Sequence, residues 1–276
     1  MTGTVIEAIE AAAPALGRET GAQCIHRSLG VLRLLAGSPP DGVKLVDIAA
    51  ELGLPHPTAH RILKALEEEG VVERVRGTRR YTIGSEAAWL GLPAANRFPI
   101  SQAAAPALDR LCEAVGDSVF LAVRSRNDSV YVDRRIGSYP VQARRLTLGA
   151  RRPLGVSIAS RAIMAYLPKE KTADILMENE RRYVDYRLTP DRIIEDLATA
   201  RSQGFLLASS LTNIERRVLS VPVFDIVGAP VAAISVIASM QRLQNDRVER
   251  ILPKLKLAAS AISERLLESN TLARAC

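Results

Sequence analysis

A short pattern around residue 50 constrains the fold more than any other part of the chain. Two helices that cross over a tight turn need a small residue at their contact and a turn residue that tolerates a positive φ. They also need apolar residues that face back from the second helix. Ala49, Gly53 and the pair Ala59 and Ile62 meet these demands in that order. The pattern therefore predicts a helix-turn-helix within "KLVDIAAELGLPHPTAHRILKALEEEG", residues 44–70.

The flanking segments extend this unit. Apolar spacing predicts a preceding helix over residues 24–36, and apolar–charged alternation around a Gly-Thr turn predicts a hairpin over residues 71–84. The hairpin contains "RVRGTRR", which has four arginines and no acid. Beside a recognition helix it is expected to be a wing on DNA phosphates or in a minor groove. The alternative is a solvated basic turn.

The front of the helix that starts near residue 57 is polar in a way that core packing does not require. Pro57 suits a first helical turn, whose amides are expected to be unpaired and to attract phosphate. Three glutamates at residues 67–69 would repel DNA, so only the first two turns are expected to enter a groove. His60 is alternatively a surface residue without a DNA contact. The predicted DNA-binding residues are His56, Pro57, Thr58, His60, Arg61, Lys64, Arg76, Arg79 and Arg80.

The remainder of the chain mixes helices and strands without a strict βαβ alternation, which predicts an α+β domain with a mostly antiparallel sheet. A connecting helix with a Pro-marked break is expected before a helix that ends near Gly116. The predicted strands are residues 117–125, 128–137, 142–147, 205–209, 217–225 and 230–238, and the predicted helices are 157–167, 191–203 and 244–268.

Composition narrows the functional class. The net charge of +7 and the pI of about 9.6 favour an anionic partner. Cys24, Cys112 and Cys276 are far apart, which implies neither a disulfide framework nor a zinc site. All three histidines occur by residue 60, and the chain has no P-loop, dinucleotide fingerprint or GxSxG motif. We therefore predict no catalytic residue, no metal site and no cofactor.

The same reasoning bears on location. The N-terminal residues carry glutamates where a secretory signal needs a basic start and a clean apolar core. The longest uncharged apolar run, residues 228–240, is too short to span a bilayer. We expect a cytoplasmic, nucleoid-associated protein without a membrane partner, in which the Ala-rich residues 1–20 are frayed or form a loose helix.

Residues 24–268 resemble the IclR family of bacterial transcription regulators. In family order, the resemblance rests on "LVDIAAELGLPHPTAHRILKALEEEGVVER", "YTIG", "PLGVSIASRAIMAYLP", "RSQGFLL", "VLSVPVFDIVGAPVAAISVIA" and "AAISERLL". It implies a winged helix-turn-helix domain (residues 21–84), a linker helix that helps dimerisation (85–100), and an effector-binding and oligomerisation domain (101–276) with a GAF-like or profilin-like fold. It also implies homodimers or dimers of dimers (homotetramers) on pseudo-palindromic double-stranded DNA, with a small metabolite as the signal.

The resemblance also implies an effector pocket. Its residues here would be Leu146, Leu154, Gly155, Val156, Ser157, Ile158, Val218, Ser220, Ser235 and Ile237. The chain departs from the family pattern because His56 and Pro57 replace a basic residue and a serine. Ile237 replaces a polar residue that some members have, and residues 208–217 lack most of the family's carboxylates. These changes imply a less acidic pocket with a more apolar wall.

Arginines within residues 134–152 favour an anionic effector. The stretch contains Arg134, Arg135, Arg144, Arg145, Arg151 and Arg152 and no acid. Adjacent strand residues point to opposite faces, so at most half of these arginines could face a pocket, and the alternative is a solvated or subunit-interface surface. We expect a small organic acid held by pocket amides, Ser157 and one arginine.

The sequence thus predicts a sequence-specific transcriptional regulator, a repressor in preference to an activator, that is controlled by a small organic acid. Two alternatives stay open at this point. One is an enzyme that converts a small molecule and carries an appended basic domain. The other is a DNA-binding oligomer that senses no ligand.

Overall fold

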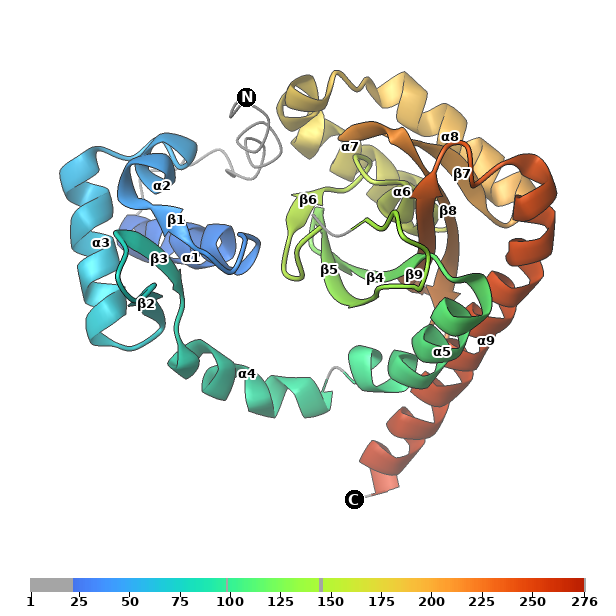
Figure 1. The fold of residues 1–276 in the computed structure, drawn as a ribbon, viewed down its shortest axis with the longest axis horizontal. Coiled ribbons are helices and arrows are strands. Elements are labelled where there is room, and N and C mark those ends of the chain that lie inside the picture. Colours follow the sequence, from blue (N-terminus) through green and yellow to red (C-terminus); the bar gives the residue numbers. More distant parts are fainter. Residues whose placement is uncertain (1–21, 98, 144–145, 276) are drawn as a thin grey trace. The chain divides into compact units, whose positions relative to one another are not determined.

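The computed structural model describes residues 22–97, 99–143 and 146–275, so the prediction for residues 1–20 lies outside it. The chain divides into two compact units (Figure 1). The N-terminal unit extends to residue 98 and takes in residues 147–151, and the C-terminal unit comprises residues 99–146 and 152–276. Each unit is described by itself.

The N-terminal unit contains the predicted helices and hairpin. The helices are α1 (Gln23–Ala36), α2 (Leu45–Glu51), α3 (His56–Glu68) and α4 (Ser85–Arg97). The hairpin strands β2 (Val72–Arg74) and β3 (Arg80–Ile83) pair antiparallel, and the two-residue strand β1 (Val43–Lys44), which was not predicted, adds to the other edge of β3. The result is a three-helix unit with a three-stranded antiparallel sheet in the order β1-β3-β2.

The predicted helix-turn-helix contact is confirmed. Ala49, Ala59 and Ile62 are buried in one core together with residues of α1 and the hairpin. The turn is made by Gly53, whose φ of 59° lies in the left-handed region. Its N–H donates to the carbonyl of Ala50 at 3.1 Å, and the N–H of Leu54 donates to the carbonyl of Ala49 at 2.8 Å. This pair of bonds ends α2 and sets the direction of α3.

The C-terminal unit is built on a six-stranded sheet in the order β6-β5-β4-β9-β8-β7. The pairings β4–β5, β4–β9, β9–β8 and β8–β7 are antiparallel, as predicted. The strands are β4 (Ser118–Ser125), β5 (Asp128–Arg135), β6 (Arg151–Pro153), β7 (Leu206–Ser210), β8 (Asn213–Phe224) and β9 (Pro230–Ser239).

Helices cover both faces of this sheet (Figure 1). One face packs against α5 (Ile100–Val115) and the long C-terminal α9 (Asn245–Ala275). The other face contacts α6 (Ile158–Met164), and α8 (Pro190–Gln203) lies against α6 and β7. The remaining helical elements are α7 (Lys169–Tyr183) and the 3₁₀ turn η1 (Val184–Tyr186).

Two predictions for this unit were incomplete or wrong. The strand expected over residues 142–147 is absent from the described part of that segment, and residues 144–145 lie outside it. Side chains fix the backbone there instead, because the amide of Gln142 donates to the carbonyl of Gly116 at 3.0 Å and Ser118 Oγ accepts from the N–H of Ala143 at 3.1 Å. The third strand on this side is β6.

Helix α7 was also not predicted. Its sequence, "KEKTADILMENERRY", is mostly charged and buries only a narrow stripe of five residues. Its apolar periodicity is therefore weak. Among the described residues, none of the helices, α7 and the long α9 included, combines the length and the apolar character needed to span a membrane.

Candidate DNA-binding surface and effector site

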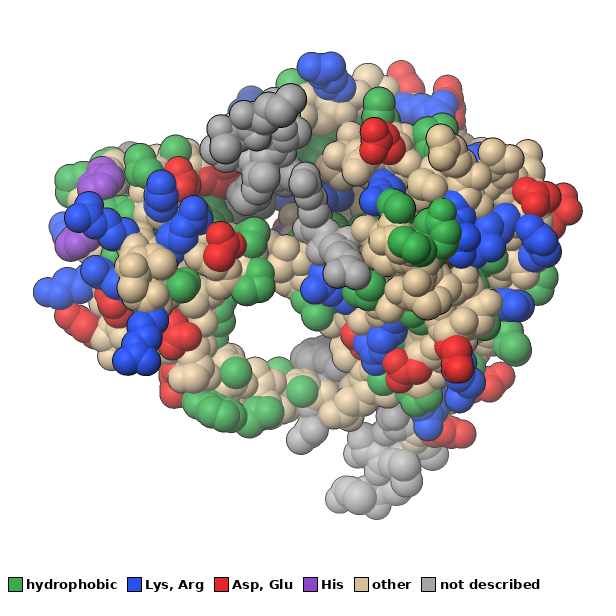
Figure 2. Space-filling model, viewed as in Figure 1, with side chains coloured by type: hydrophobic (Ala, Val, Ile, Leu, Met, Phe, Trp, Pro, Cys, Tyr) green, Lys and Arg blue, Asp and Glu red, His purple; other side chains and the backbone are tan. Residues whose placement is uncertain are grey.

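Helix α3 presents a basic outer face. Its inner residues are buried in the core, whereas His56, His60, Arg61 and Lys64 are exposed and Thr58 is half-buried. Within the described part of the chain, the side chains of His56, His60 and Arg61 have no hydrogen-bond or ion-pair partner. Figure 2 shows Lys, Arg and His side chains gathered on the side of the N-terminal unit where Figure 1 places α3 and the hairpin. These groups are free to meet an anionic surface.

The first turn of α3 offers fewer amide donors than expected. Pro57 has no N–H, and the N–H of Thr58 donates to the carbonyl of Pro55 at 2.9 Å. The N–H of Ala59 donates to the same carbonyl at 3.0 Å, which leaves at most the N–H of His56. The expectation of several unpaired amides was therefore wrong, and attraction for phosphate here must come from the side chains.

The acidic end of α3 is balanced by neighbouring cations. Lys64 Nζ lies 3.8 Å from a carboxylate oxygen of Glu68, and Arg74 Nε lies 3.3 Å from a carboxylate oxygen of Glu67. The Arg74 guanidinium also lies over the ring of Tyr81, 5.1 Å from its centroid. Exposed pairs such as Lys64–Glu68 are worth little, so Lys64 can exchange its carboxylate for a phosphate.

The wing has a defined turn at its tip. Gly77 has a φ of 75°, which an L-residue adopts only with strain. The hydroxyl of Thr78 donates to the carbonyl of Val75 at 2.8 Å and accepts from the N–H of Arg80 at 3.1 Å. The turn is thus fixed by its own side chains.

The wing arginines divide into two kinds. The Arg80 guanidinium donates to the carbonyl of Gly42 at 2.8 Å and lies 3.7 Å from a carboxylate oxygen of Asp41, so it fastens the wing to the segment before β1. Arg76 and Arg79 are exposed, and their side chains have no partner among the described residues. These two arginines are the free cations at the tip.

In the C-terminal unit, serines lie on the sheet face that α6 covers. Ser235 on β9 pairs in register with Phe120 on β4 and Ser220 on β8. The Ser220 and Ser235 hydroxyls hydrogen-bond to each other, and these residues are only 0% and 1% exposed. Ile237, two residues further along β9, pairs in register with Val218 on β8. On β8 and β9 the two hydroxyls thus satisfy each other, and their neighbours Val218 and Ile237 on this face are apolar.

The loop that precedes α6 is tied down by hydrogen bonds. The Tyr183 hydroxyl donates to the carbonyl of Leu154 at 2.5 Å, and burial raises the pKa of this phenol to about 12. Gly155 has a φ of 101°, and its N–H donates to Ser160 Oγ at 3.0 Å. Ser157 Oγ accepts from the N–H of Ser160 at 3.0 Å and caps α6. Ser157 thus has a structural role, and its contact with an effector stays a prediction.

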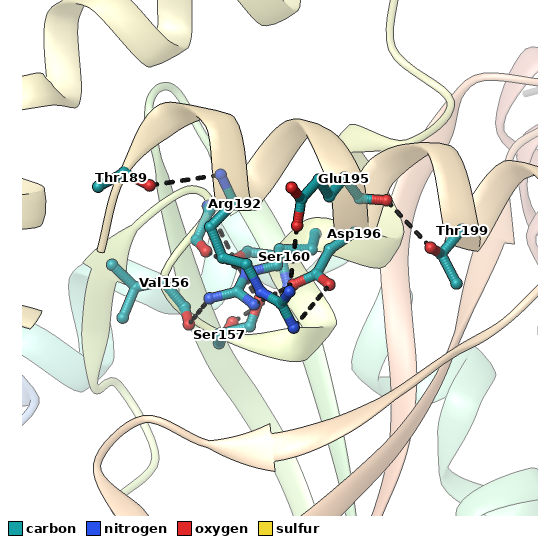
Figure 3. A network of polar contacts seen from close by, with 10 residues as sticks. Val156, Ser157, Ser160, Thr189, Arg192, Glu195, Asp196 and Thr199 are labelled. Carbon is teal, nitrogen blue, oxygen red and sulfur yellow. Dashed lines mark hydrogen bonds and ion pairs between the residues drawn. The ribbon is translucent and has the colours of Figure 1, made fainter. Parts of the chain in front are cut away.

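A buried ion pair completes this arrangement (Figure 3). The Arg161 guanidinium donates to the carbonyls of Gly155 at 2.6 Å and Val156 at 3.4 Å, and it pairs with Asp196 on α8. Burial lowers the pKa of Arg161, which the Asp196 carboxylate partly offsets. Sequence reasoning missed this pair, although an arginine within the apolar run "IASRAIMAYL" was a visible signal.

Most predicted effector residues are therefore buried. Nine of the ten are buried in the loop before α6, at the first residue of α6 (Ile158) or on the sheet strands, and Leu146 is half-buried. The prediction did not include Ser118, which begins β4 on the same sheet face as Ser220 and Ser235. The Ser118 hydroxyl donates to the side-chain amide oxygen of Gln142 at 2.6 Å.

The arginines of residues 134–152 mostly serve protein contacts. Arg134 donates to the carbonyl of Leu146 at 2.8 Å, and Arg135 pairs with Asp109 and Asp133. Residues 134–152 contain no acid, but these two carboxylates lie outside that stretch in sequence and pair with one of its arginines in the structure. The prediction did not take them into account. Arg144 and Arg145 lie outside the described residues.

Other groups suited to catalysis or metal binding are sparse. In residues 22–97, 99–143 and 146–275, no cluster of three His, Cys, Asp or Glu side chains could hold a metal ion. Cys24 is exposed and Cys112 is buried, and burial raises the pKa of the Cys112 thiol. Cys276 lies outside the described residues.

Sequence profiles identify both units. The profile of the IclR helix-turn-helix domain matches residues 25–76, and that of the bacterial transcriptional regulator IclR C-terminal domain matches residues 93–264. The HTH-type transcriptional regulator KipR of Bacillus subtilis is 25% identical over 244 residues, which cover 88% of this chain and 96% of KipR. The transcriptional repressor IclR of Escherichia coli is 28% identical over 242 residues, which cover 86% of each chain.

Solved structures agree on the fold. An IclR-type transcriptional regulator from Alicyclobacillus acidocaldarius superposes with a TM-score of 0.71 at 23% identity, covering 88% of this chain and 98% of that one. An IclR homologue from Microbacterium hydrocarbonoxydans, complexed with 4-hydroxybenzoate, gives a TM-score of 0.67 at 21% identity, covering 89% of this chain and 99% of that one. The named relatives are regulators, in agreement with the expectation that this chain is not an enzyme. With both domains matched in order, the chain belongs to the IclR family of bacterial transcriptional regulators.

Proposed function

We propose that this regulator is a repressor that binds a pseudo-palindromic double-stranded operator and responds to a small organic acid. The observation that carries the DNA part is the row of exposed side chains on α3, His56, His60 and Arg61, which have no partner among the described residues. The names of relatives such as the repressor IclR of Escherichia coli support repression over activation.

On DNA, we assign different roles to the basic residues. Arg61 reads a base edge in the major groove, where a guanidinium can pair bidentately with guanine. His56, Pro57, Thr58 and His60 surround it, and Lys64 leaves Glu68 for a phosphate. Arg76 and Arg79 at the wing tip contact phosphates or the minor groove, whereas Arg80 positions the wing.

The proposed domain roles are those that the resemblance to the family implies. Residues 21–84 form the DNA-binding domain, residues 85–100 link it, and residues 101–276 bind effector and oligomerise. A pseudo-palindromic operator needs two recognition helices related by a two-fold axis, so the working species is a homodimer or a dimer of dimers. The exposed apolar residues Trp89, Leu90 and Leu92 of α4 support a dimer contact through the linker helix. A regulator of chromosomal DNA acts in the cytoplasm.

The effector part of the proposal rests on the sheet face of Ser220 and Ser235. Hydroxyls beside apolar residues such as Val218 and Ile237 suit an organic acid with an apolar body, because a small number of well-placed polar groups fixes the orientation of a ligand. The homologue complexed with 4-hydroxybenzoate supports this ligand class. Since the face is buried, effector binding must open it, and the loop before α6 is the element that moves.

The DNA proposal is tested by fluorescence anisotropy on duplexes from the chain's own upstream intergenic region and on scrambled duplexes, at two salt concentrations. The protein should bind the native duplex tightly and the scrambled one weakly, with a steep salt dependence. Arg61→Ala should weaken only specific binding, by about 1–3 kcal/mol. Arg250→Ala is the control, since Arg250 lies on α9 in an exposed pair with Asp246. An equal loss on both duplexes would make Arg61 a phosphate contact.

The effector proposal is tested by calorimetry with 4-hydroxybenzoate and its amide. The acid should bind and the amide should not. The double variant Ser220→Ala/Ser235→Ala should weaken the acid by about tenfold, the effect of one lost hydrogen bond to a charged group. Equal binding of acid and amide, or no effect of the double variant, would refute this part and leave the DNA part standing.

A further inference from the structure

A depression in the C-terminal unit lies away from the predicted effector face. It has a volume of about 540 Å³ and lies between α8 and β7, the edge strand of the sheet. Both Leu206 and Leu207 line it, and successive strand residues point to opposite faces, so it follows the outer edge of β7. None of the ten predicted effector residues belongs to its lining. Its size suits a small molecule, since ligand sites span about 300–1,000 Å³.

The charged groups of the depression favour an anion. Arg192 on α8 reaches along the helix toward Glu195 and Asp196 (Figure 3). It lies 3.1 Å from Glu195 Oε2 and 3.8 Å from Asp196 Oδ1. The Arg192 side chain is 62% exposed, so its pairing with Glu195 is weak and a ligand carboxylate can displace it. A guanidinium binds a carboxylate bidentately, which adds both strength and orientation.

A second cation lies on the strand side of the same depression. Arg217 on β8 pairs in register with Ser209 on β7. Its Nη1 donates to the carbonyl of Leu243 at 2.9 Å, which holds the guanidinium in place. Arg217 and Ser209 both line the depression, but they do so from the sheet face that α5 and α9 cover, so this hydroxyl and fixed positive charge lie around the edge of β7 from Arg192.

The remaining lining is largely aliphatic. Leu188 and Leu206 are buried, Leu207 is half-buried and Leu211 is exposed at the turn between β7 and β8. A wholly polar anion would leave these leucine side chains exposed to water. A carboxylate with an apolar body would cover the leucines and place its charge at Arg192, and the positive charge of Arg217 around the strand edge adds a longer-range attraction.

The depression is connected to the loop before α6 by hydrogen bonds. Asp196 lines the depression and pairs with Arg161, and Arg161 holds the carbonyls of Gly155 and Val156. An anion that takes Arg192 away from Asp196 changes the field at the Asp196 carboxylate. Arg161 is the next group in this chain of contacts.

We propose that the α8–β7 depression is a second binding site, for a small carboxylate with an apolar body, and that its occupation alters the loop before α6 through Asp196 and Arg161. The site stands on its own geometry; only the regulatory consequence rests on the proposed effector face. Coupling of this kind is reciprocal, so each ligand would change the affinity of the other by the same factor.

The test uses the full chain and 4-bromobenzoate, with 4-bromobenzamide as the neutral probe. The background variant Ser220→Ala/Ser235→Ala weakens binding at the effector face, so the depression contributes a larger share of the binding that remains. Adding Arg192→Gln should weaken this binding by about tenfold or more. Adding Arg250→Gln should not, although Arg250 is a matched helix-surface arginine, 71% exposed and 2.9 Å from Asp246. Anomalous scattering from bromine in crystals locates the probe.

The outcomes separate this proposal from the preceding one. Bromine beside Arg192, with binding that Arg192→Gln reduces and the amide does not share, supports the second site. Bromine only beside Ser220 and Ser235, or equal binding by the Arg192→Gln and Arg250→Gln variants, overturns it and leaves the effector face in place. Bromine only in the depression upholds the second site and refutes the effector face. A saturating probe that leaves the depression empty overturns the second site.

Discussion

Asp117 offers a sharp test of how buried charge stabilises the C-terminal unit. It is 1% exposed and follows Gly116, which ends α5. Its two carboxylate oxygens accept from Arg242 Nε at 2.6 Å and from Arg247 Nη2 at 2.7 Å. One carboxylate thus joins the α5–β4 connection to the segment that starts α9. Asp117→Asn keeps the shape of this side chain and removes its charge.

The expected loss follows from the hydrogen bonds. Asparagine keeps one oxygen for one arginine but turns an NH₂ group toward the other, which leaves two donors facing each other. Removing one partner of a buried pair costs about 3–5 kcal/mol. The side chains of Arg242 and Arg247 are 23% and 22% exposed, so water can satisfy them in part. We therefore expect Asp117→Asn to lower the free energy of unfolding by about 2–3 kcal/mol, the upper part of the range for hydrogen bonds to charged groups.

Asp246→Asn is the matched control. Asp246 pairs with Arg250 at 2.9 Å, but the two side chains are 72% and 71% exposed, so its loss should cost about 0.5 kcal/mol or less. Urea denaturation at neutral pH, followed by circular dichroism, measures both losses, and the m-value should not change. A Tm about 4–12 °C lower is expected for Asp117→Asn alone. Equal losses for the two variants would refute the argument that burial makes the difference.

Two further predictions concern the backbone turn and the loop before α6. Gly53→Ala should cost about 1–2 kcal/mol, because its φ is 59° but its added Cβ meets nothing within 4 Å. Gly42→Ala should cost more, because its φ is 76° and its Cβ would lie 2.7 Å from the carbonyl oxygen of Tyr81; reversal of this order in urea unfolding would contradict the geometry. Tyr183→Phe should cost about 1 kcal/mol through the lost bond to Leu154. Because the pKa of Tyr183 is raised from 10.0 to about 12, its contribution is complete below pH 10 and lost as the pH rises through 12. When the unfolding midpoint is measured as a function of pH, the Phe variant should lack the fall near pH 12 that the wild type shows. Identical pH profiles for the two proteins would contradict this role of Tyr183.

Much of the N-terminal unit could be predicted because its helices and turn are determined by residues that are close together in sequence. The contact of Ala49 with α3, the left-handed turn at Gly53 and the apolar face of α3 all follow from spacings of a few residues. Strand β1 could not be predicted, since two residues have no periodicity and the strand exists only through its pairing with β3. The tether of Arg80 to Gly42 depends on the same pairing, so a free wing arginine and a fastened one look alike in sequence.

In the C-terminal unit, the missed features are those that join distant residues. The strands and α9 follow from alternation and amphipathic spacing, but the partner of Arg161 lies 35 positions further along the chain. The resemblance to the family supplied the loop before α6 and the serines on β8 and β9. It did not supply Ser118 on β4 or Gln142, whose side chains hydrogen-bond to each other.

The burial of the proposed effector face has a consequence for how a ligand would act there. The hydroxyls of Ser220 and Ser235 satisfy each other, so an entering carboxylate must replace a hydrogen bond that is already made. The loop before α6 resists displacement through its bonds to Tyr183 and Arg161, which run to α7 and α8. A ligand can shift an equilibrium only by its differential affinity for the two states, so part of its binding energy must go into breaking these bonds. Opening the face therefore strains the contacts of α7 and α8. The rearrangement would involve α6, α7 and α8 together and not the loop alone.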